Sequence, residues 1–296
     1  MESPDCKRAI STPSSRPLSN QRPKTYHLLY IHGGCWGDPA INVTKALQPT
    51  VAHLSSAYPV TLSQVGGLAS IDYRLSPYPD HPTDPSGDDP DRNVRHPQHM
   101  HDVVQAIQKL QREYNIKRWI GVGHSCGASI LCHILGQLSL DASHTIIRPE
   151  ALILISGIYD LKGLLQYRFP PAFPQEVFDV YTAFFERAFG SDHSIYDSIS
   201  PLAMKLDEKN WPEGKLIVVS HSPDEELVEP EQSDLMRAEL PRQGWQVIMG
   251  EESLDSKLEP GKRVVNVASI KGAHRFVWND GQQTASLISR VVRKLN

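Results

Sequence analysis

Residues 119–127, Trp-Ile-Gly-Val-Gly-His-Ser-Cys-Gly, decide the fold that the sequence predicts. They begin with an apolar run typical of a buried strand and end where an apolar helical pattern begins, so the GxSxG motif lies between a strand and a helix. Gly123 and Gly127 are small enough for the sharp turn that this position requires. The turn leaves the hydroxyl of Ser125 at the helix N-terminus, where the helix dipole favours developing negative charge. Ser125 is therefore the candidate nucleophile.

The nucleophile needs a base, because a serine hydroxyl attacks only when its proton is removed, and a carboxylate must orient that base. In chains with this turn the order along the sequence is serine, acid, histidine. His274 is the last histidine of the chain, and it lies between a predicted strand at residues 264–270 and the final predicted helix. We predict that His274 is the general base.

The acid should follow the preceding predicted strand, residues 216–220, where the chain reads HSPDEELV. Asp224, Glu225 and Glu226 compete for the role. The acid commonly stands two residues before a Leu that precedes another apolar residue, which favours Glu225, whereas Asp224 is shorter and nearer the strand. The sequence leaves this choice open. The acids that are not used are expected to form a solvated helix start, where negative charge is favoured.

A second glycine-containing turn follows the predicted strand at residues 26–31. It consists of His32, Gly33, Gly34, Cys35 and Trp36. Glycines at this position let backbone N–H groups approach a substrate oxygen, so we expect an oxyanion hole formed by the N–H groups of Gly34, Cys35 and Cys126. Loss of one such donor typically costs about 3 kcal/mol of barrier. The alternative is a plain Gly-Gly turn beside a buried tryptophan.

The rest of the chain alternates apolar runs with amphipathic segments, which is the pattern of an α/β fold with a mostly parallel, doubly wound sheet. The predicted strands are residues 26–31, 68–73, 119–123, 151–156, 216–220 and 264–270. Helical periodicity covers residues 100–114, 126–138 and 282–295, with a weaker pattern at 43–56. Pro49 lies inside that weaker pattern, so we expect it to kink the helix or delay its start.

Three segments stand outside this alternation. Residues 1–24 lack hydrophobic periodicity and are expected to be a mobile tail, which leaves residues 25–296 as a single catalytic domain. Residues 79–95 are dense in Pro and Asp and predict a solvated loop. Residues 161–206 carry eight aromatic side chains between Tyr167 and Phe189, outside the predicted sheet, and suggest a lid or a wall of the substrate pocket, unless those side chains simply pack on the core.

Composition narrows the partners and the location. The chain has 296 residues, 40% of them hydrophobic, and a formal net charge of -4, with no basic run that would favour nucleic acid or an anionic membrane. We therefore expect a small-molecule substrate. No apolar stretch approaches the roughly 20 residues of a membrane-spanning helix, and residues 1–24 lack the apolar core of a signal peptide, so a cytoplasmic location is expected.

Two further groups of side chains are interpreted as structural. The cysteines fit neither a zinc pair nor a redox motif, and they are expected to be small buried hydrophobes; they are Cys6, Cys35, Cys126 and Cys132. His96, His99 and His101 lack the spacing of a metal site and are interpreted as a polar helix start. Arg74, in the segment DYRLSP, is expected to shape the wall below the oxyanion loop, with a substrate carboxylate as its alternative partner.

These motifs together resemble the esterase-like α/β-hydrolases. HGGxW with this spacing, GHSCGA and HSPDEELV are similar, more narrowly, to the fungal kynurenine formamidases of tryptophan catabolism, and the resemblance spans residues 25–296. It implies hydrolysis of N-formyl-L-kynurenine to L-kynurenine and formate without a metal or organic cofactor, and a homodimer. The chain departs from the family pattern at two places: the aspartate expected as triad acid falls in register with Glu225, which leaves the acid open, and the insertion at 79–95 has no assigned role.

Two alternative functions remain at this point. A carboxylesterase acting on small acyl esters would use the same triad and differ only in its pocket. A non-catalytic binding protein of the same fold is disfavoured, because such proteins lose members of the triad and this sequence keeps the candidate nucleophile, base and oxyanion loop.

Overall fold

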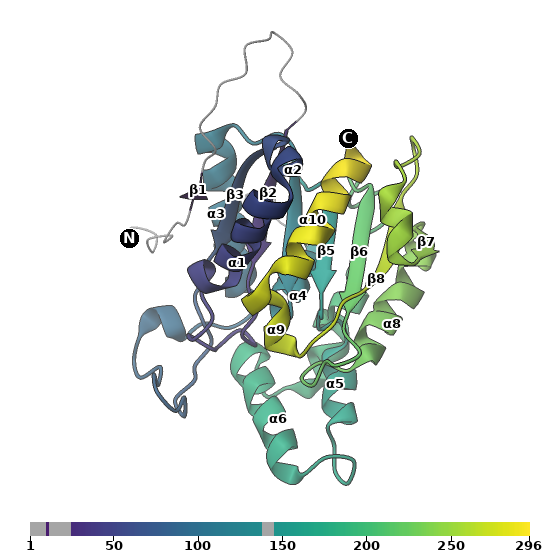
Figure 1. The fold of residues 1–296 in the computed structure, drawn as a ribbon. Helices are drawn as coiled ribbons and strands as arrows, with labels where there is room; N and C mark the ends of the chain where they lie inside the picture. Colours follow the sequence, from purple (N-terminus) through teal and green to yellow (C-terminus); the bar gives the residue numbers. More distant parts are fainter. Residues whose placement is uncertain (1–9, 12–24, 138–144) are drawn as a thin grey trace.

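An eight-stranded sheet with the order β1-β3-β2-β4-β5-β6-β8-β7 forms the centre of the molecule (Figure 1). The computed structural model describes residues 10–11, 25–137 and 145–296. All neighbouring strands pair in parallel except β1, which is antiparallel to β3. The strands are β1 (Ile10–Ser11), β2 (Tyr26–Ile31), β3 (Val65–Ile71), β4 (Trp119–His124), β5 (Ala151–Ile155), β6 (Leu216–His221), β7 (Gln246–Met249) and β8 (Val264–Ser269).

Helices cover both faces of the sheet, which explains why its central strands are continuously apolar. On one face lie α1 (Val43–Ala57), α9 (His274–Asp280) and α10 (Gln282–Leu295), and Figure 1 shows α1 and α10 running side by side there. On the other face lie α3 (Gln98–Tyr114), α4 (Cys126–Gln137) and α8 (Pro230–Glu239). Each face has its own hydrophobic core. A mostly parallel sheet with helices packed on both faces is the α/β-hydrolase architecture that the sequence predicts.

A group of short helices follows β5 and lies beyond the carboxyl ends of the strands; we call residues 161–206 the cap (Figure 1). It contains α5 (Leu161–Tyr167), α6 (Gln175–Phe189), η4 (His193–Ile195), α7 (Tyr196–Ile199) and η5 (Pro201–Ala203). The other short helices are α2 (Pro59–Ser63), η1 (Pro90–Arg92), η6 (Leu240–Gln243) and η7 (Glu251–Asp255).

Some aromatic side chains of the cap pack on the core, and others are exposed as a lid or pocket wall requires. Phe185 and Phe189 are buried and pack edge-on against Trp36, so they belong to the core. Tyr167 and Phe169 are exposed. Whether the cap moves as a lid stays a prediction.

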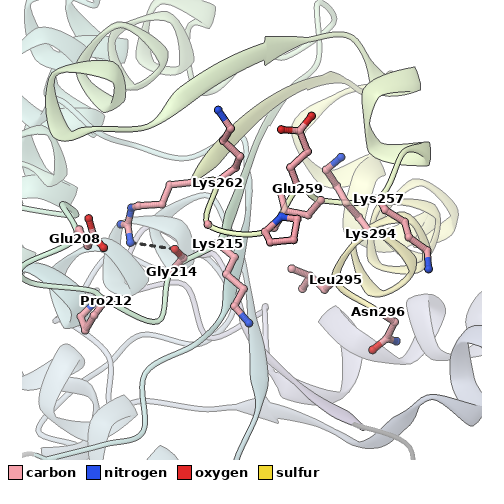
Figure 2. Close-up of a pocket in the computed structure, with 14 residues that line it drawn as sticks. Glu208, Pro212, Gly214, Lys215, Lys257, Glu259, Lys262, Lys294, Leu295 and Asn296 are labelled. Carbon is pink, nitrogen blue, oxygen red and sulfur yellow. Dashed lines mark hydrogen bonds between the residues drawn. The ribbon is translucent and has the colours of Figure 1, made fainter.

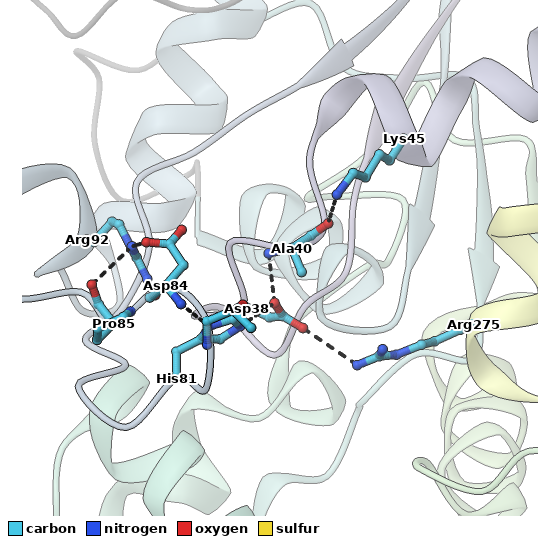
Figure 3. Close-up of polar contacts among 9 residues, drawn as sticks. Asp38, Ala40, Lys45, His81, Asp84, Pro85, Arg92 and Arg275 are labelled. Atoms are coloured by element: carbon cyan, nitrogen blue, oxygen red, sulfur yellow. Dashed lines mark hydrogen bonds and ion pairs between the residues drawn. The ribbon is translucent and has the colours of Figure 1, made fainter.

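The insertion at residues 79–95 is mostly exposed but is held at defined points. Within it, Arg92 pairs with Asp84 at 2.8 Å. Figure 3 shows His81 approaching Asp38, which follows the HGGCW turn, with 3.5 Å between the ring Nε2 and a carboxylate oxygen. The same carboxylate lies 3.8 Å from Arg275, next to His274. The insertion therefore contacts the loop that precedes α1.

Some local predictions need correction. Helix α1 starts at Val43, capped by the side chain of Asn42, and continues through Pro49 to Ala57, so the proline does not delay its start. Strand β3 begins at Val65, three residues earlier than predicted, and β7 was missed. The predicted mobile tail, except for β1, and the last predicted residue of α4 lie outside the described residues. Among the described helices, none is long and apolar enough to cross a membrane.

Candidate active site

The turn around Ser125 has the strained geometry that exposes a nucleophile. Ser125 joins β4 to α4 with a φ of 54°, a left-handed conformation that costs a residue other than glycine on the order of 1–3 kcal/mol. A side chain at Gly127 would run into the carbonyl oxygen of Ile31, and one at Gly123 would lie 2.7 Å from the backbone of Ala128. The N–H of Ser125 donates to the carbonyl of Ile155 at 2.9 Å and anchors the turn to the neighbouring strand.

His274, the first residue of α9, contacts one of the three competing acids directly. Its ring Nδ1 lies 2.7 Å from Oε1 of Glu225, and both side chains are almost fully buried, 6% and 0% exposed. The same Oε1 accepts the N–H of Leu227 at 2.9 Å. Because Nδ1 faces the carboxylate, Nε2 is left as the nitrogen that can accept a proton.

The carboxylate of Glu225 stays ionised in this environment. Burial raises its pKa, but hydrogen bonds from His274 and from the N–H of Leu227, together with the charge of protonated His274, outweigh burial and hold the pKa at about 2. An ionised acid stabilises the imidazolium that forms when the histidine takes a proton.

The two neighbouring acids hold the backbone around the histidine. Oδ2 of Asp224 accepts the N–H of Gly272 at 3.1 Å, and Oε2 of Glu226 accepts the N–H of His274 at 2.8 Å. Asp224 and Glu226 are exposed, as expected, but they lie in a loop ahead of α8 and not at a helix start, and both of them fasten the histidine loop. We call residues 222–228 the acid loop.

The HGGCW turn approaches Ser125 from the adjacent strand. Gly34, Cys35 and Trp36 all have left-handed backbone conformations, with φ values of 106°, 50° and 61°. The N–H of Trp36 donates to the thiol of Cys126 at 3.3 Å and so links this turn to the first residue of α4. The first N–H groups of a helix have no intrahelical acceptor, so the N–H of Cys126 is free of α4's own ladder.

The segment after β3 holds the HGGCW turn through contacts with His32. Asp72 accepts from Nε2 of His32 at 2.9 Å, and the ring of Tyr73 stacks on the same imidazole with 4.6 Å between the centroids. The hydroxyl of Tyr73 donates to the carbonyl of His32 at 3.2 Å. Arg74 is committed to Asp102 through two bonds of 2.9 and 2.8 Å, which favours its structural role over a substrate carboxylate.

His124 is a member of the site that the sequence analysis missed, although it stands next to the nucleophile. Its ring lies 4.5 Å from that of His274, centroid to centroid, and burial lowers its pKa far below the ordinary value. A neutral ring beside His274 adds bulk without a competing charge. Position in the motif was the only signal for it, since the residue before the serine of GxSxG can be almost any type.

The other described histidines are not gathered into a metal-binding group. Within the described residues, no group of three or more His, Cys, Asp or Glu side chains could hold a metal ion. His99 is buried in the first turn of α3 and contacts the hydroxyl of Ser76 at 3.0 Å, so the interpretation of a polar helix start is wrong for this residue. Cys126 and Cys132 are buried thiols, as expected, whereas Cys35 is only partly buried because it lies in the HGGCW turn, and Cys6 lies outside the described residues.

A pocket of about 350 Å³ lies away from these loops, before the starts of β6 and β8 and beside the end of α10 (Figure 2). Its cations are already engaged in part, because Lys215 pairs with Glu150 and Lys294 donates to the carbonyls of Ser253 and Ser256. The candidate nucleophile and base do not line it.

The strand order, the strained turn at Ser125 and the buried His274–Glu225 pair define an α/β-hydrolase of the serine type. Solved structures support the fold: a thermostable carboxylesterase cloned from a metagenomic library has a TM-score of 0.60 and 15% identity, over 97% of this chain and 84% of that protein. A carboxyl esterase from Tuber melanosporum gives the same TM-score and identity, over 98% and 82%. No family model matches the chain.

Curated relatives identify the family. A kynurenine formamidase-like hydrolase of Fusarium equiseti is 34% identical over 275 residues, which is 91% of this chain and 84% of the relative. A kynurenine formamidase of Aspergillus versicolor is 32% identical over 267 residues, or 86% and 84%. The chain belongs to the kynurenine formamidase family.

Proposed function

We propose that this enzyme hydrolyses N-formyl-L-kynurenine to L-kynurenine and formate with a triad of Ser125, His274 and Glu225. Family membership supports the substrate. The observation that carries the mechanism is the buried 2.7 Å contact between the His274 ring and the Glu225 carboxylate, beside the left-handed Ser125. No step of this chemistry calls for a metal or an organic cofactor.

The reaction takes place in two halves. In the first, the Ser125 oxygen attacks the formyl carbon while His274 takes the hydroxyl proton, and the C–N bond then breaks as His274 returns that proton to the departing aniline nitrogen. In the second, His274 removes a proton from water as the water oxygen attacks the formyl-serine, and the C–O bond to Ser125 then breaks as His274 returns that proton to the serine oxygen and formate is released. The N–H groups of Gly34, Cys35 and Cys126 would stabilise the oxyanion in both halves.

The competing activity, hydrolysis of small acyl esters, predicts a different substrate preference. Binding of the remote aryl and amino-acid groups can lower the barrier at the formyl carbon, so kcat/KM should be far higher for N-formylkynurenine than for a short aryl ester. Steady-state kinetics on both substrates tests this. Ser125→Ala is the control and should lose about 10⁶-fold in turnover while its thermal unfolding stays near that of the wild type. Equal or better efficiency on the ester would favour the esterase.

The finer features of the protein are part of the same proposal. Residues 25–296 would act as one catalytic domain on a small molecule in the cytoplasm, and the family resemblance supports a homodimer. Light scattering during size-exclusion chromatography measures the mass in solution, and a monomeric mass at micromolar concentration would contradict the dimer.

A further inference from the structure

The cap contains a buried cation without an ionic partner. Arg168, at the end of α5, is only 5% exposed, and among the described residues no carboxylate forms an ion pair with it. Its Nη2 donates to the carbonyl of Glu226 at 3.2 Å, and its Nε is buried without any hydrogen-bond partner. An unpaired buried charge is costly, so the arrangement favours an anionic partner that the protein itself does not supply.

Aromatic rings hold this guanidinium in place. Its central carbon lies 4.6 Å from the ring centroid of Phe173, 4.8 Å from that of Tyr181 and 5.3 Å from that of Tyr167. Cation–π contacts offset part of the cost of burial and fix the plane of the group, but they use its face. The Nε–H at the edge has no partner in the protein and is left for a carboxylate.

A buried anion without a full set of partners lies nearby. Glu229, which precedes α8, is 3% exposed; its Oε1 accepts from Gln232 at 2.7 Å, while its Oε2 is buried without a partner. The charge of Arg168 acts on Glu229, yet the two side chains make no ion pair. Burial raises the pKa of Glu229, and a bound ammonium group would favour its ionised form.

Both charges adjoin the catalytic loops. Arg168 contacts the backbone of Glu226, one residue after the triad acid, and Glu229 follows the same acid loop. Tyr181 lies among them: its hydroxyl donates to the carbonyl of Leu227 at 2.7 Å, and its electrostatic neighbours are Arg168, Cys35, Glu229 and Glu225. Arg168 and Glu229 thus both adjoin the loop that carries the triad acid.

We propose that Arg168 and Glu229 form a subsite for the α-amino-acid end of the substrate, with Arg168 binding its carboxylate and Glu229 its ammonium group. Two buried charges of opposite sign, each with one anchored and one unpartnered polar atom, are complementary to a zwitterion. This subsite rests on the proposed function, because it places the amino-acid end of a formylated aryl amino acid in the cap while the formyl group faces Ser125.

Three formamides test the assignment: N-formyl-L-kynurenine, its desamino analogue, which keeps the carboxylate, and ortho-formamidoacetophenone, which has neither charge. In Arg168→Gln, kcat/KM should fall at least about 30-fold for the first two compounds and stay within about threefold for the third. In Glu229→Gln, only N-formyl-L-kynurenine should lose efficiency. Arg168→Lys should recover part of the loss, since it keeps the charge without the planar fork.

The matched control is Arg187→Gln, which removes another cap arginine whose partner is the exposed Asp80. It should leave the ranking of the three compounds unchanged. Equal losses on all three formamides in Arg168→Gln would overturn the proposal, because a merely structural role in holding the acid loop does not distinguish substrates. Thermal unfolding of each variant shows whether it folds. If Arg168→Gln does not fold, the substrate preferences of Glu229→Gln and Arg168→Lys decide whether the subsite exists.

Failure of the proposed function gives a different result. If the wild type hydrolyses a short ester but none of the formamides, the formamidase activity is refuted. Calorimetric titration with L-kynurenine then tests the subsite alone: binding that weakens at least about 30-fold in Arg168→Gln and in Glu229→Gln supports it, and unchanged or undetectable binding refutes it.

Discussion

The orientation of His274 depends on a single oxygen atom. Oε1 of Glu225 contacts the ring and also accepts the N–H of Leu227, so the carboxylate has little freedom to turn away. An amide at this position can present its NH₂ group to Nδ1 and stabilise the wrong tautomer, as happens in triads whose acid is made an amide.

We therefore predict that Glu225→Gln loses roughly 10⁴-fold in kcat. Asp224→Asn should lose much less, because an asparagine oxygen can still accept the N–H of Gly272. Parallel assays of the two purified variants on N-formylkynurenine measure the difference. A crippled Asp224→Asn beside an active Glu225→Gln would transfer the role to Asp224, and less than tenfold loss in both would place the orienting acid elsewhere.

At the scale of the elements, α6 of the cap holds the acid loop from outside. The hydroxyl of Tyr181 donates to the backbone of Leu227, two residues beyond Glu225. Removal of that hydroxyl leaves a carbonyl without its donor and loosens the loop that carries the acid, at a cost of about 1 kcal/mol.

Tyr181→Phe should thus lower kcat about fivefold with every substrate, since the acid loop serves the chemistry and not the choice of substrate. Single-turnover kinetics on N-formylkynurenine and on a short ester measures it. Tyr167→Phe, at an exposed position of α5, is the control and should behave as the wild type. A loss restricted to one substrate would indicate that Tyr181 acts by contacting that substrate.

Elements with a strong local signal were predictable from the sequence. The central strands and α10 have continuous or periodic apolar patterns, and the structure places them within a few residues of the prediction. Strand β7 escaped because it lies at the sheet edge, where its four residues are at most half-buried and give no apolar run. Pro49 misled because tertiary packing of α1 on α10 compensates for the backbone bond that a proline lacks.

The site was predictable only where a motif carries the chemistry. Ser125 and His274 belong to patterns that can be recognised from their order and neighbours in the sequence. The backbone-holding roles of Asp224 and Glu226, and the burial of Arg168 and Glu229, depend on which loops meet in space. Charged residues are normally solvated, so no sequence pattern indicated that Arg168 and Glu229 lie inside.

At the scale of the whole molecule, the site lies where the order of the sheet reverses. Strands β2 and β4 are neighbours, while the chain continues from β2 to β3 on one side and from β4 to β5 on the other. Loops leaving the carboxyl ends of two such strands separate and leave a crevice, and ligands of open α/β folds bind there. The HGGCW turn and the turn of Ser125 leave β2 and β4 at this point.

The stability of the whole fold should fall in mild acid. Burial is the main cause that lowers the pKa of His96 and His99 to about 3 and that of His133 to about 4. These rings are neutral when folded but take up protons near pH 6.5 when unfolded. Their contribution is thus complete above about pH 6.5 and is lost progressively as the pH falls toward the folded values.

One such histidine costs about 1.4 kcal/mol of unfolding free energy a full unit below pH 6.5. Urea unfolding at pH 7.5 and at pH 5.5 measures the change. His99→Gln should make the free energy of unfolding less dependent on pH than it is in the wild type. An unchanged pH dependence in His99→Gln would mean that its ring is protonated in the folded state.

The fastening of His274 by three consecutive acids also has a consequence for biosynthesis. A ribosome makes the nucleophile's turn long before it makes residue 274, and the acid loop has nothing to grip until that residue arrives. In a nascent chain the turn of Ser125 can therefore form before its general base is present. Hydrolysis begins only when α9 docks and the acid loop binds the backbone N–H groups of Gly272 and His274 and the imidazole of His274. The onset of hydrolysis during translation would thus report the docking of α9 on the sheet.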